Sequence, residues 1–313
     1  MSIDCDVTVF RKVFFFSILS FYLFVFCGFL LNTDSKQNNF NIISKNTKSQ
    51  SFNLNLPLTF SLDENFHIPN GFRKGGLCIA VISTNRTNYL IEVLETLFKY
   101  IQKYEPNLNY NLVWVDTASF HQGQLNIELS RRFHFDRKIF LSSPTDNRQV
   151  EGISTSNQLA LSLCSKNDFF MPLEDDWKLH PNARIGFLQK TIELLNASPH
   201  QLYGIVYKET EPRSKDEKTI VVKVGEESFK VYYGLDRGAF SYTNGAAIYR
   251  MANIKEFYKD GVEHNNMFEI CLSRVVNKLG HFFGFVDLID NCTKGPGNCY
   301  GVFQHIGKVS TWR

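Results

Sequence analysis

The sequence predicts an α/β domain whose mostly parallel sheet is covered by helices on both faces. Residues 77–82 form a continuous apolar run, which is typical of a parallel strand buried on both sides. A helix should follow, because apolar residues then recur at helical spacing: Leu90, Leu94, Leu97 and Ile101. The same alternation continues along the chain, and alternating strands and helices favour a parallel sheet.

The other predicted elements follow in chain order. Strands are expected at 111–115, 138–142 and 168–173, and helices near 154–165 and from Pro181, where Ile185, Leu188, Ile192 and Leu195 share a face. In the second half of the chain, residues 220–233 are interpreted as a hairpin. Gly280 should end a helix that follows Glu263.

The N-terminal segment contains a candidate membrane span. Residues 13–31 carry no charge, and as a helix they would be about 28 Å long, which is enough to cross a bilayer core. Arg11 and Lys12 precede this run, and it ends without the small-residue site of a signal peptide, so an uncleaved anchor is favoured over a cleaved signal. We therefore expect residues 1–12 to be a cytoplasmic tail. The short, Phe-rich span suits a thin membrane such as that of the endoplasmic reticulum or Golgi.

A polar stem is expected after the span. Fourteen of the 25 residues from 32 to 56 are Asn, Ser or Lys, and they show no helical or strand periodicity. Such a segment buries too little apolar surface to order itself. We therefore expect a flexible lumenal stem over residues 32–74 and one folded domain over residues 75–313.

Charge argues against a nucleic-acid partner, and the cysteines and sequons indicate candidate sites of covalent modification. The formal net charge of +3 is small for 313 residues and no Lys/Arg-rich run occurs, so no nucleic-acid partner is expected. Cys292 and Cys299 flank a Gly- and Pro-rich loop and are the expected disulfide, whereas Cys78 is interpreted as a small core residue. The chain also contains N-x-S/T sequons, at Asn85, Asn196 and Asn291.

Three consecutive acidic residues follow the predicted strand at 168–173. Glu174, Asp175 and Asp176 would repel one another unless a cation lies among them. Carboxylate oxygens suit Mg²⁺ or Mn²⁺ better than zinc, and a diphosphate would complete the coordination shell. The alternative is an acidic cap on a solvated turn, where carboxylates interact favourably with a helix dipole.

Two further polar segments follow predicted strands. The first strand leads into a polar loop, made of Ser83, Thr84, Asn85 and Arg86. The second strand ends on Asp116, which would accept hydrogen bonds from a base or ribose, or else form a simple Asx turn. Ligands of parallel α/β sheets bind at the carboxyl ends of the strands, so polar segments at three predicted strand ends favour a ligand site. Near the C-terminus, His305 offers an imidazole to the same metal.

Taken in order, these segments resemble the GT-A superfamily of nucleotide-sugar-dependent glycosyltransferases, in a family 2-like form. The matching segments are residues 78–86 (first strand and nucleotide loop), 113–119 (second strand with its nucleoside-contacting Asp), 173–177 (the DxD metal motif as EDD), Glu263 (the acidic base position) and 305–307 (the C-terminal metal-ligand His). The resemblance covers about residues 75–313 and implies a GT-A-type mixed, mostly parallel sheet, with a nucleotide-binding half and an acceptor-binding half. The family often has Glu-Asp at the base position, whereas His264 follows Glu263 here, so Glu269 is an alternative base.

The resemblance also implies a reaction and a set of roles. A divalent ion, Mn²⁺ or Mg²⁺, held by Asp176 with Asp175 and His305, would neutralise the leaving diphosphate of a nucleotide-sugar donor. Glu174 would contact the ribose or the donor sugar, and Glu263 would take the proton from an acceptor hydroxyl, which implies inversion. The expected enzyme is a hexosyl- or N-acetylhexosaminyltransferase of the endoplasmic reticulum or Golgi membrane, and its acceptor is a glycan, glycoprotein or glycolipid.

Two other interpretations use the same residues. A sugar nucleotidyltransferase shares the strand order and the metal chemistry, but such enzymes are usually soluble, which the predicted anchor argues against. A non-catalytic carbohydrate-binding or scaffolding module would have a degenerate site, but the acids at 116, 174–176 and 263 are all present. Metal-dependent hydrolysis of a nucleotide-sugar by the purified protein would separate these interpretations.

Overall fold

The structure, a computed structural model, describes most of the predicted folded domain. The described residues are 75–117, 119, 121–141, 156–157, 159–207, 218–233, 245–254, 276, 279–292, 299 and 301–307. The predicted tail, span and stem lie outside these residues, and so do Glu263 and Glu269. No helix in the described part of the chain has the length and apolar character needed to cross a bilayer.

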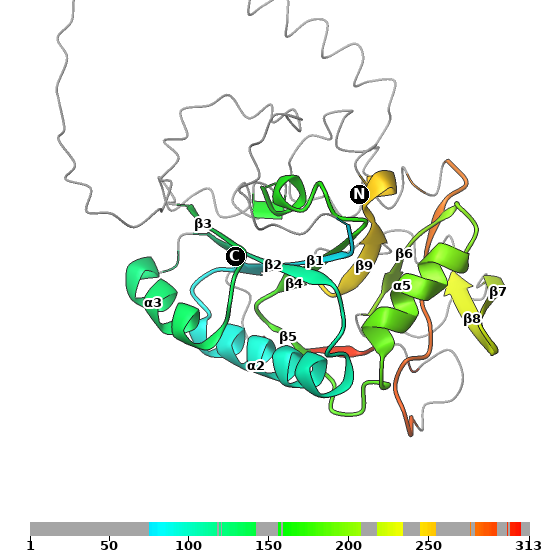
Figure 1. The fold of residues 1–313 in the computed structure, drawn as a ribbon, viewed down its shortest axis with the longest axis horizontal. Coiled ribbons are helices and arrows are strands. Elements are labelled where there is room, and N and C mark those ends of the chain that lie inside the picture. The colour runs from blue at the N-terminus through cyan, green and yellow to red at the C-terminus, as the bar shows by residue number, and fades with distance from the viewer. Residues whose placement is uncertain are drawn as a thin grey trace, which may run out of the picture. The chain divides into compact units, whose positions relative to one another are not determined.

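A seven-stranded sheet forms the centre of the domain, with the strand order β10-β6-β9-β4-β1-β2-β3 (Figure 1). Its strands are β1 (Leu77–Ser83), β2 (Tyr110–Thr117), β3 (Arg137–Leu141), β4 (Phe169–Glu174), β6 (Leu202–Val206), β9 (Ala247–Arg250) and β10 (Phe282–Gly284). Only β9 runs antiparallel to its neighbours β4 and β6 within this sheet, and the other pairings are parallel. The predicted mixed, mostly parallel sheet is therefore confirmed.

Helices cover both faces of this sheet, as the apolar run in the first strand predicts. The helices are α2 (Thr87–Tyr104), α3 (Gln122–Arg132) and α5 (Phe187–Ala197), and residues 156–157 and 159–163 are also helical. Ile79 and Val81 of β1 belong to the core that contains the buried residues of α2, α3 and α5. Cys78 and Ala80 point the other way, into a second core with Leu159. Figure 1 shows α2 and α3 on one side of the sheet and the green helical turns of residues 156–157 and 159–163 on the other.

Two small antiparallel sheets complete the described domain. The predicted hairpin is present as β7 (Lys218–Val224) and β8 (Glu227–Tyr233), and it turns at Gly225, whose φ of 60° suits glycine. The second pair joins β5 (Trp177–Leu179) to β11 (Phe303–His305). This pairing carries the C-terminal segment back to the chain directly after the three acidic residues.

The start of α5 differs from the sequence prediction, which placed it at Pro181. The helix begins at Phe187, and Ile185 is 57% exposed instead of facing the core. Residues before the helix pair with a distant segment, because Ala183 bridges to Ile289. Gly186 then adopts a left-handed φ of 76°, which breaks the helical path.

Side chains of α2 satisfy the first N–H groups of α5. The hydroxyl of Tyr100 accepts from the Phe187 N–H at 3.1 Å. The buried carboxylate of Glu105, directly after α2, accepts from Leu188 N at 3.1 Å and from Gln189 N at 2.8 Å. Burial raises the pKa of Glu105 above its ordinary value, and these two N–H groups oppose the rise. The carboxylate therefore replaces the missing local cap of α5.

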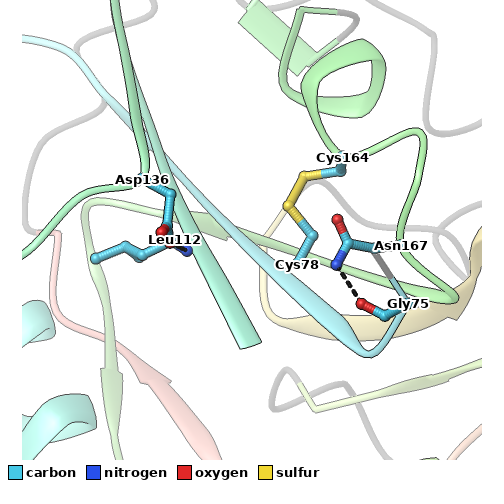
Figure 2. The surroundings of a disulfide bond; sticks show 6 residues. All are labelled: Gly75, Cys78, Leu112, Asp136, Cys164 and Asn167. Atoms are coloured by element: carbon cyan, nitrogen blue, oxygen red, sulfur yellow. Dashed lines mark hydrogen bonds between the residues drawn. A yellow bond between two sulfur atoms is a disulfide. The ribbon is translucent and has the colours of Figure 1, made fainter. Parts of the chain in front are cut away.

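Two disulfides lie among the described residues. Cys292–Cys299 is present, as predicted. Cys78 of β1 is a buried core residue, as predicted, but it is more than that, because it is bonded to Cys164 at the end of the helical segment on the sheet (Figure 2). Both sulfurs are fully buried, so the pair looks like ordinary core from the sequence, while the bond ties that helical segment to the central strand.

Candidate active site

The polar ends of three neighbouring strands meet at one edge of the sheet. In the parallel register, Ser83 at the end of β1 is the partner of Asp116 on β2, and Ile82 is the partner of Glu174 on β4. Parallel strands present their carboxyl ends at the same edge, which is where ligands of such sheets bind. The structure therefore brings together the loop after β1, Asp116 and the acidic residues.

Asp116 is fully buried and accepts four hydrogen bonds. Oδ2 accepts from the hydroxyls of Ser83 and Ser119, both at 2.6 Å. Oδ1 accepts from Ser119 N at 3.1 Å and from Gln122 Nε2 at 2.7 Å. A carboxylate offers about four acceptor positions, so these bonds use its capacity. The contact of Asp116 with a base or ribose stays a prediction, and it would require one of these donors to turn away.

Hydrogen bonds hold the loop after β1 on two sides. Thr84 donates its N–H to Asp175 Oδ2 at 2.9 Å and its hydroxyl to the carbonyl of Thr117 at 2.7 Å. Asn85, with a left-handed φ of 51°, donates its N–H to the Ser119 hydroxyl at 2.7 Å. Two buried carboxylates thus set the shape of this loop. Asp175, after β4, binds the loop directly, and Asp116, on β2, acts through the Ser119 hydroxyl.

The acidic residues differ in burial and in partners. Asp175 and Asp176 are 2% and 3% exposed, whereas Glu174 is half-buried and lies 3.4 Å from the indole nitrogen of Trp177. Arg86, the last residue of the β1 loop, lies against both aspartates. Its Nη1 donates to Asp176 Oδ2, and its Nε is 3.4 Å from Asp175 Oδ1. The trio is therefore no solvated cap, because two of its carboxylates are buried against a guanidinium that offsets one of their charges.

Burial shifts the titration of Asp175 strongly. Desolvation raises its pKa to about 7, while the Arg86 charge and the Thr84 N–H oppose the rise. The nearby carboxylates of Asp176 and Asp116 push the pKa further upward. A second positive charge at this place would favour the ionised form of Asp175.

The C-terminal segment closes the other side of Asp176. His305 Nε2 is 3.0 Å from Asp176 Oδ2, and Ile306 N donates to the Asp176 carbonyl at 2.8 Å. The His305 ring also packs against Trp177, with 5.1 Å between ring centroids. At Gly307 a side chain has no room, because a Cβ there would lie 2.4 Å from Asp176 Oδ2.

The donor set fits a hard divalent cation in part. Asp176 Oδ1 is buried and accepts no hydrogen bond from the described residues, and Oδ2 faces the exposed imidazole of His305. Asp175 is already used by Thr84 and Arg86. Within the described ranges, no three His, Cys, Asp or Glu side chains form a ligand group. Mg²⁺-type ions are often held by one or two carboxylates plus substrate phosphates, so Asp176 and His305 would suffice with a diphosphate.

Several polar residues at this edge were not singled out from the sequence. Ser119 and Gln122 bind Asp116, and Thr117 is hydrogen-bonded through its hydroxyl to Ser156. Ser156 and its neighbour Asn157 are buried at the start of the helical segment on the far face of the sheet. Their polarity inside an apolar, periodic segment was the available signal.

Fold and site together define an α/β protein with a polar, acidic site at the carboxyl edge of its sheet. No protein-family model matches the sequence, and no curated protein sequence does. The structure is similar to TarS 1–349 from S. aureus in complex with UDP, with a TM-score of 0.44 and 15% identity over 67% of this chain and 57% of that one.

Two further solved structures show a similar level of likeness. TarS 1–349 in complex with UDP-GlcNAc gives a TM-score of 0.39 and 16% identity over 63% of this chain and 54% of that one. The mannosyltransferase PcManGT from Pyrobaculum calidifontis, in complex with GDP-Man and Mn²⁺, gives 0.41 and 10% identity over 67% and 54%. This chain thus spans just over half the length of each of these three solved chains, and 34% of the longer S. aureus TarS chain.

Proposed function

We propose that this protein is a metal-dependent glycosyltransferase that moves a sugar from a nucleotide-sugar to an acceptor hydroxyl. One observation carries the proposal: three segments far apart in sequence meet at the carboxyl edge of a mostly parallel sheet. They are the loop of residues 83–86, the acids at 174–176 and the segment 305–307. The sequence resemblance to the GT-A superfamily assigns all three to donor and metal binding, and their convergence supports that assignment.

Charge at the site supports a cation bound together with a diphosphate-bearing donor. When both aspartates are ionised, Asp175, Asp176 and Arg86 are buried together with one more negative than positive charge, so a diphosphate needs additional positive charge. A divalent ion held by Asp176 and His305, with Asp175 beside it, would neutralise the leaving diphosphate. Glu174 is less buried than its neighbours, which suits contact with the ribose or the donor sugar.

The acceptor half of the reaction rests on the sequence resemblance. Glu263, or in its place Glu269, would accept the proton of the attacking hydroxyl, so the sugar would be transferred with inversion. A carboxylate must be desolvated to serve as a base near neutral pH. The transferred group is proposed to be a hexose or an N-acetylhexosamine, and the acceptor a glycan, glycoprotein or glycolipid.

We propose that the protein is a single-pass type II membrane protein of the endoplasmic reticulum or Golgi, anchored by residues 13–31, with its catalytic domain in the lumen. Disulfides persist mainly in oxidising compartments, and both Cys78–Cys164 and Cys292–Cys299 are bonded. The sequon residues Asn196 and Asn291 are exposed, as glycan attachment would require, whereas Asn85 lies in the proposed donor-binding loop.

A panel of nucleotide-sugars tests the proposal directly. The purified protein should release nucleoside diphosphate from one donor of the panel, only when Mn²⁺ or Mg²⁺ is present. An Asp290→Asn variant, which changes an exposed acid away from the site, should behave as the parent does. Saturable donor binding without turnover, with every acceptor class supplied, would instead indicate the carbohydrate-binding module.

A further inference from the structure

Arg86 holds the place at the acidic pair that a cation would take. Its backbone carbonyl accepts the first helical hydrogen bond of α2, from Leu90 N at 3.0 Å, so its position is fixed by the helix. Its side chain is 6% exposed and turns away from solvent onto Asp175 and Asp176. The two aspartates belong to the turn after β4, and only tertiary structure brings them to Arg86.

The guanidinium and a metal ion would use the same carboxylate. Arg86 Nη1 donates to Asp176 Oδ2, the oxygen that also lies 3.0 Å from His305 Nε2. Oδ1 of Asp176 is buried and accepts no hydrogen bond among the described residues, so the carboxylate has unused acceptor capacity. Since the guanidinium and the ion are both cations, each disfavours the presence of the other beside Asp176.

We propose that Arg86 is an internal counter-cation that competes with the divalent ion for the Asp176 carboxylate, an inference that rests on the proposed function. In the donor-free protein the guanidinium offsets one negative charge of the acidic pair and keeps metal affinity low. Binding of the ion requires Arg86 to release Asp176 while it retains Asp175. Arg86 is therefore a positioning residue that couples occupancy of the metal site to the loop of residues 83–86.

A metal titration without donor or acceptor tests this competition. The full-length chain is titrated with MnCl₂ while the paramagnetic resonance signal of free Mn²⁺ is followed. Arg86→Gln should bind Mn²⁺ about tenfold or more tightly than the parent, which is the scale for removing a buried like charge beside the ion. Arg86→Lys retains the charge and should stay close to the parent. Arg132→Gln removes an arginine that pairs with Glu95 on the surface, and it is the matched control.

Thermal unfolding gives a second measurement, because removing Arg86 leaves two buried carboxylates unpaired and destabilises the fold. Mn²⁺ should raise the melting temperature of Arg86→Gln by more than it raises that of the parent, since the ion replaces the lost charge. Unchanged or weaker Mn²⁺ affinity in Arg86→Gln would overturn the proposal. A variant that stays unfolded with Mn²⁺ present would overturn it too. Neither measurement involves sugar transfer, so this inference and the proposed function fail separately.

Discussion

Replacing Asp116 with alanine should remove the main polar support of the β1 loop. The substitution orphans the Ser83 hydroxyl and both donors of Ser119, while Gln122 keeps a second acceptor, the Leu141 carbonyl at 3.0 Å. At about 1–3 kcal/mol for each of the three orphaned buried donors, the loss should be about 3–9 kcal/mol of unfolding free energy. That is a large part of the 5–15 kcal/mol available to a typical domain.

Urea unfolding at neutral pH measures this loss against a matched control. Asp136 accepts one hydrogen bond, from Leu112 N at 2.7 Å, and it is only partly buried, so Asp136→Ala should cost about 1 kcal/mol. If Asp116→Ala costs no more than this control, the four hydrogen bonds do not carry the stability assigned to them. Asp116 would then be free to serve as the predicted nucleoside contact.

The remaining predictions concern pH, the base and the N-terminal segment. Because the folded-state pKa of Glu105 is raised, this residue stabilises the fold below its unfolded-state pKa, and the stabilisation is lost as pH rises through the folded-state pKa. When both proteins are unfolded by urea at a series of pH values across this window, a Glu105→Gln variant should lack this loss of unfolding free energy. Glu263→Gln should lower turnover about 10²–10⁴-fold with donor binding retained, and Glu269→Gln should not; parent-like turnover in both variants would rule out the inverting base. A chain that starts at Phe72 should be soluble and active, and an insoluble or inert product from a chain whose full-length form works would show that the domain boundary is wrong.

Local signals in the sequence were enough to predict the sheet and much of its edge. The apolar run of residues 77–82 and the helical spacing of Leu90, Leu94, Leu97 and Ile101 depend on burial within one element, and both are confirmed. The polar ends of β1, β2 and β4 were also readable, because parallel strands bring their carboxyl ends together. Their functional roles stay predictions.

Features that depend on distant pairing were not readable in the same way. The start of α5 is set by the bridge of Ala183 to Ile289 and by the carboxylate of Glu105, and neither leaves a signal near Pro181. The partner of Cys78 lies 86 residues away, inside another apolar segment. The ion pair of Arg86 with Asp176 likewise spans 90 residues, so nothing near Arg86 in the sequence indicated that it pairs with the acidic residues.

Sugar transfer by the parent and by Asp176→Asn is the measurement that tests the central claim most directly. The donor found in the nucleotide-sugar panel is incubated with glycan, glycoprotein and glycolipid acceptors and Mn²⁺, and the transferred sugar is counted. The parent should transfer, and Asp176→Asn should fall by about a hundredfold or more, since a metal ion contributes several kcal/mol of charge stabilisation. Circular dichroism should show the variant folded. Equal transfer by a folded Asp176→Asn variant and the parent would contradict the metal-dependent site proposed at the edge of this sheet.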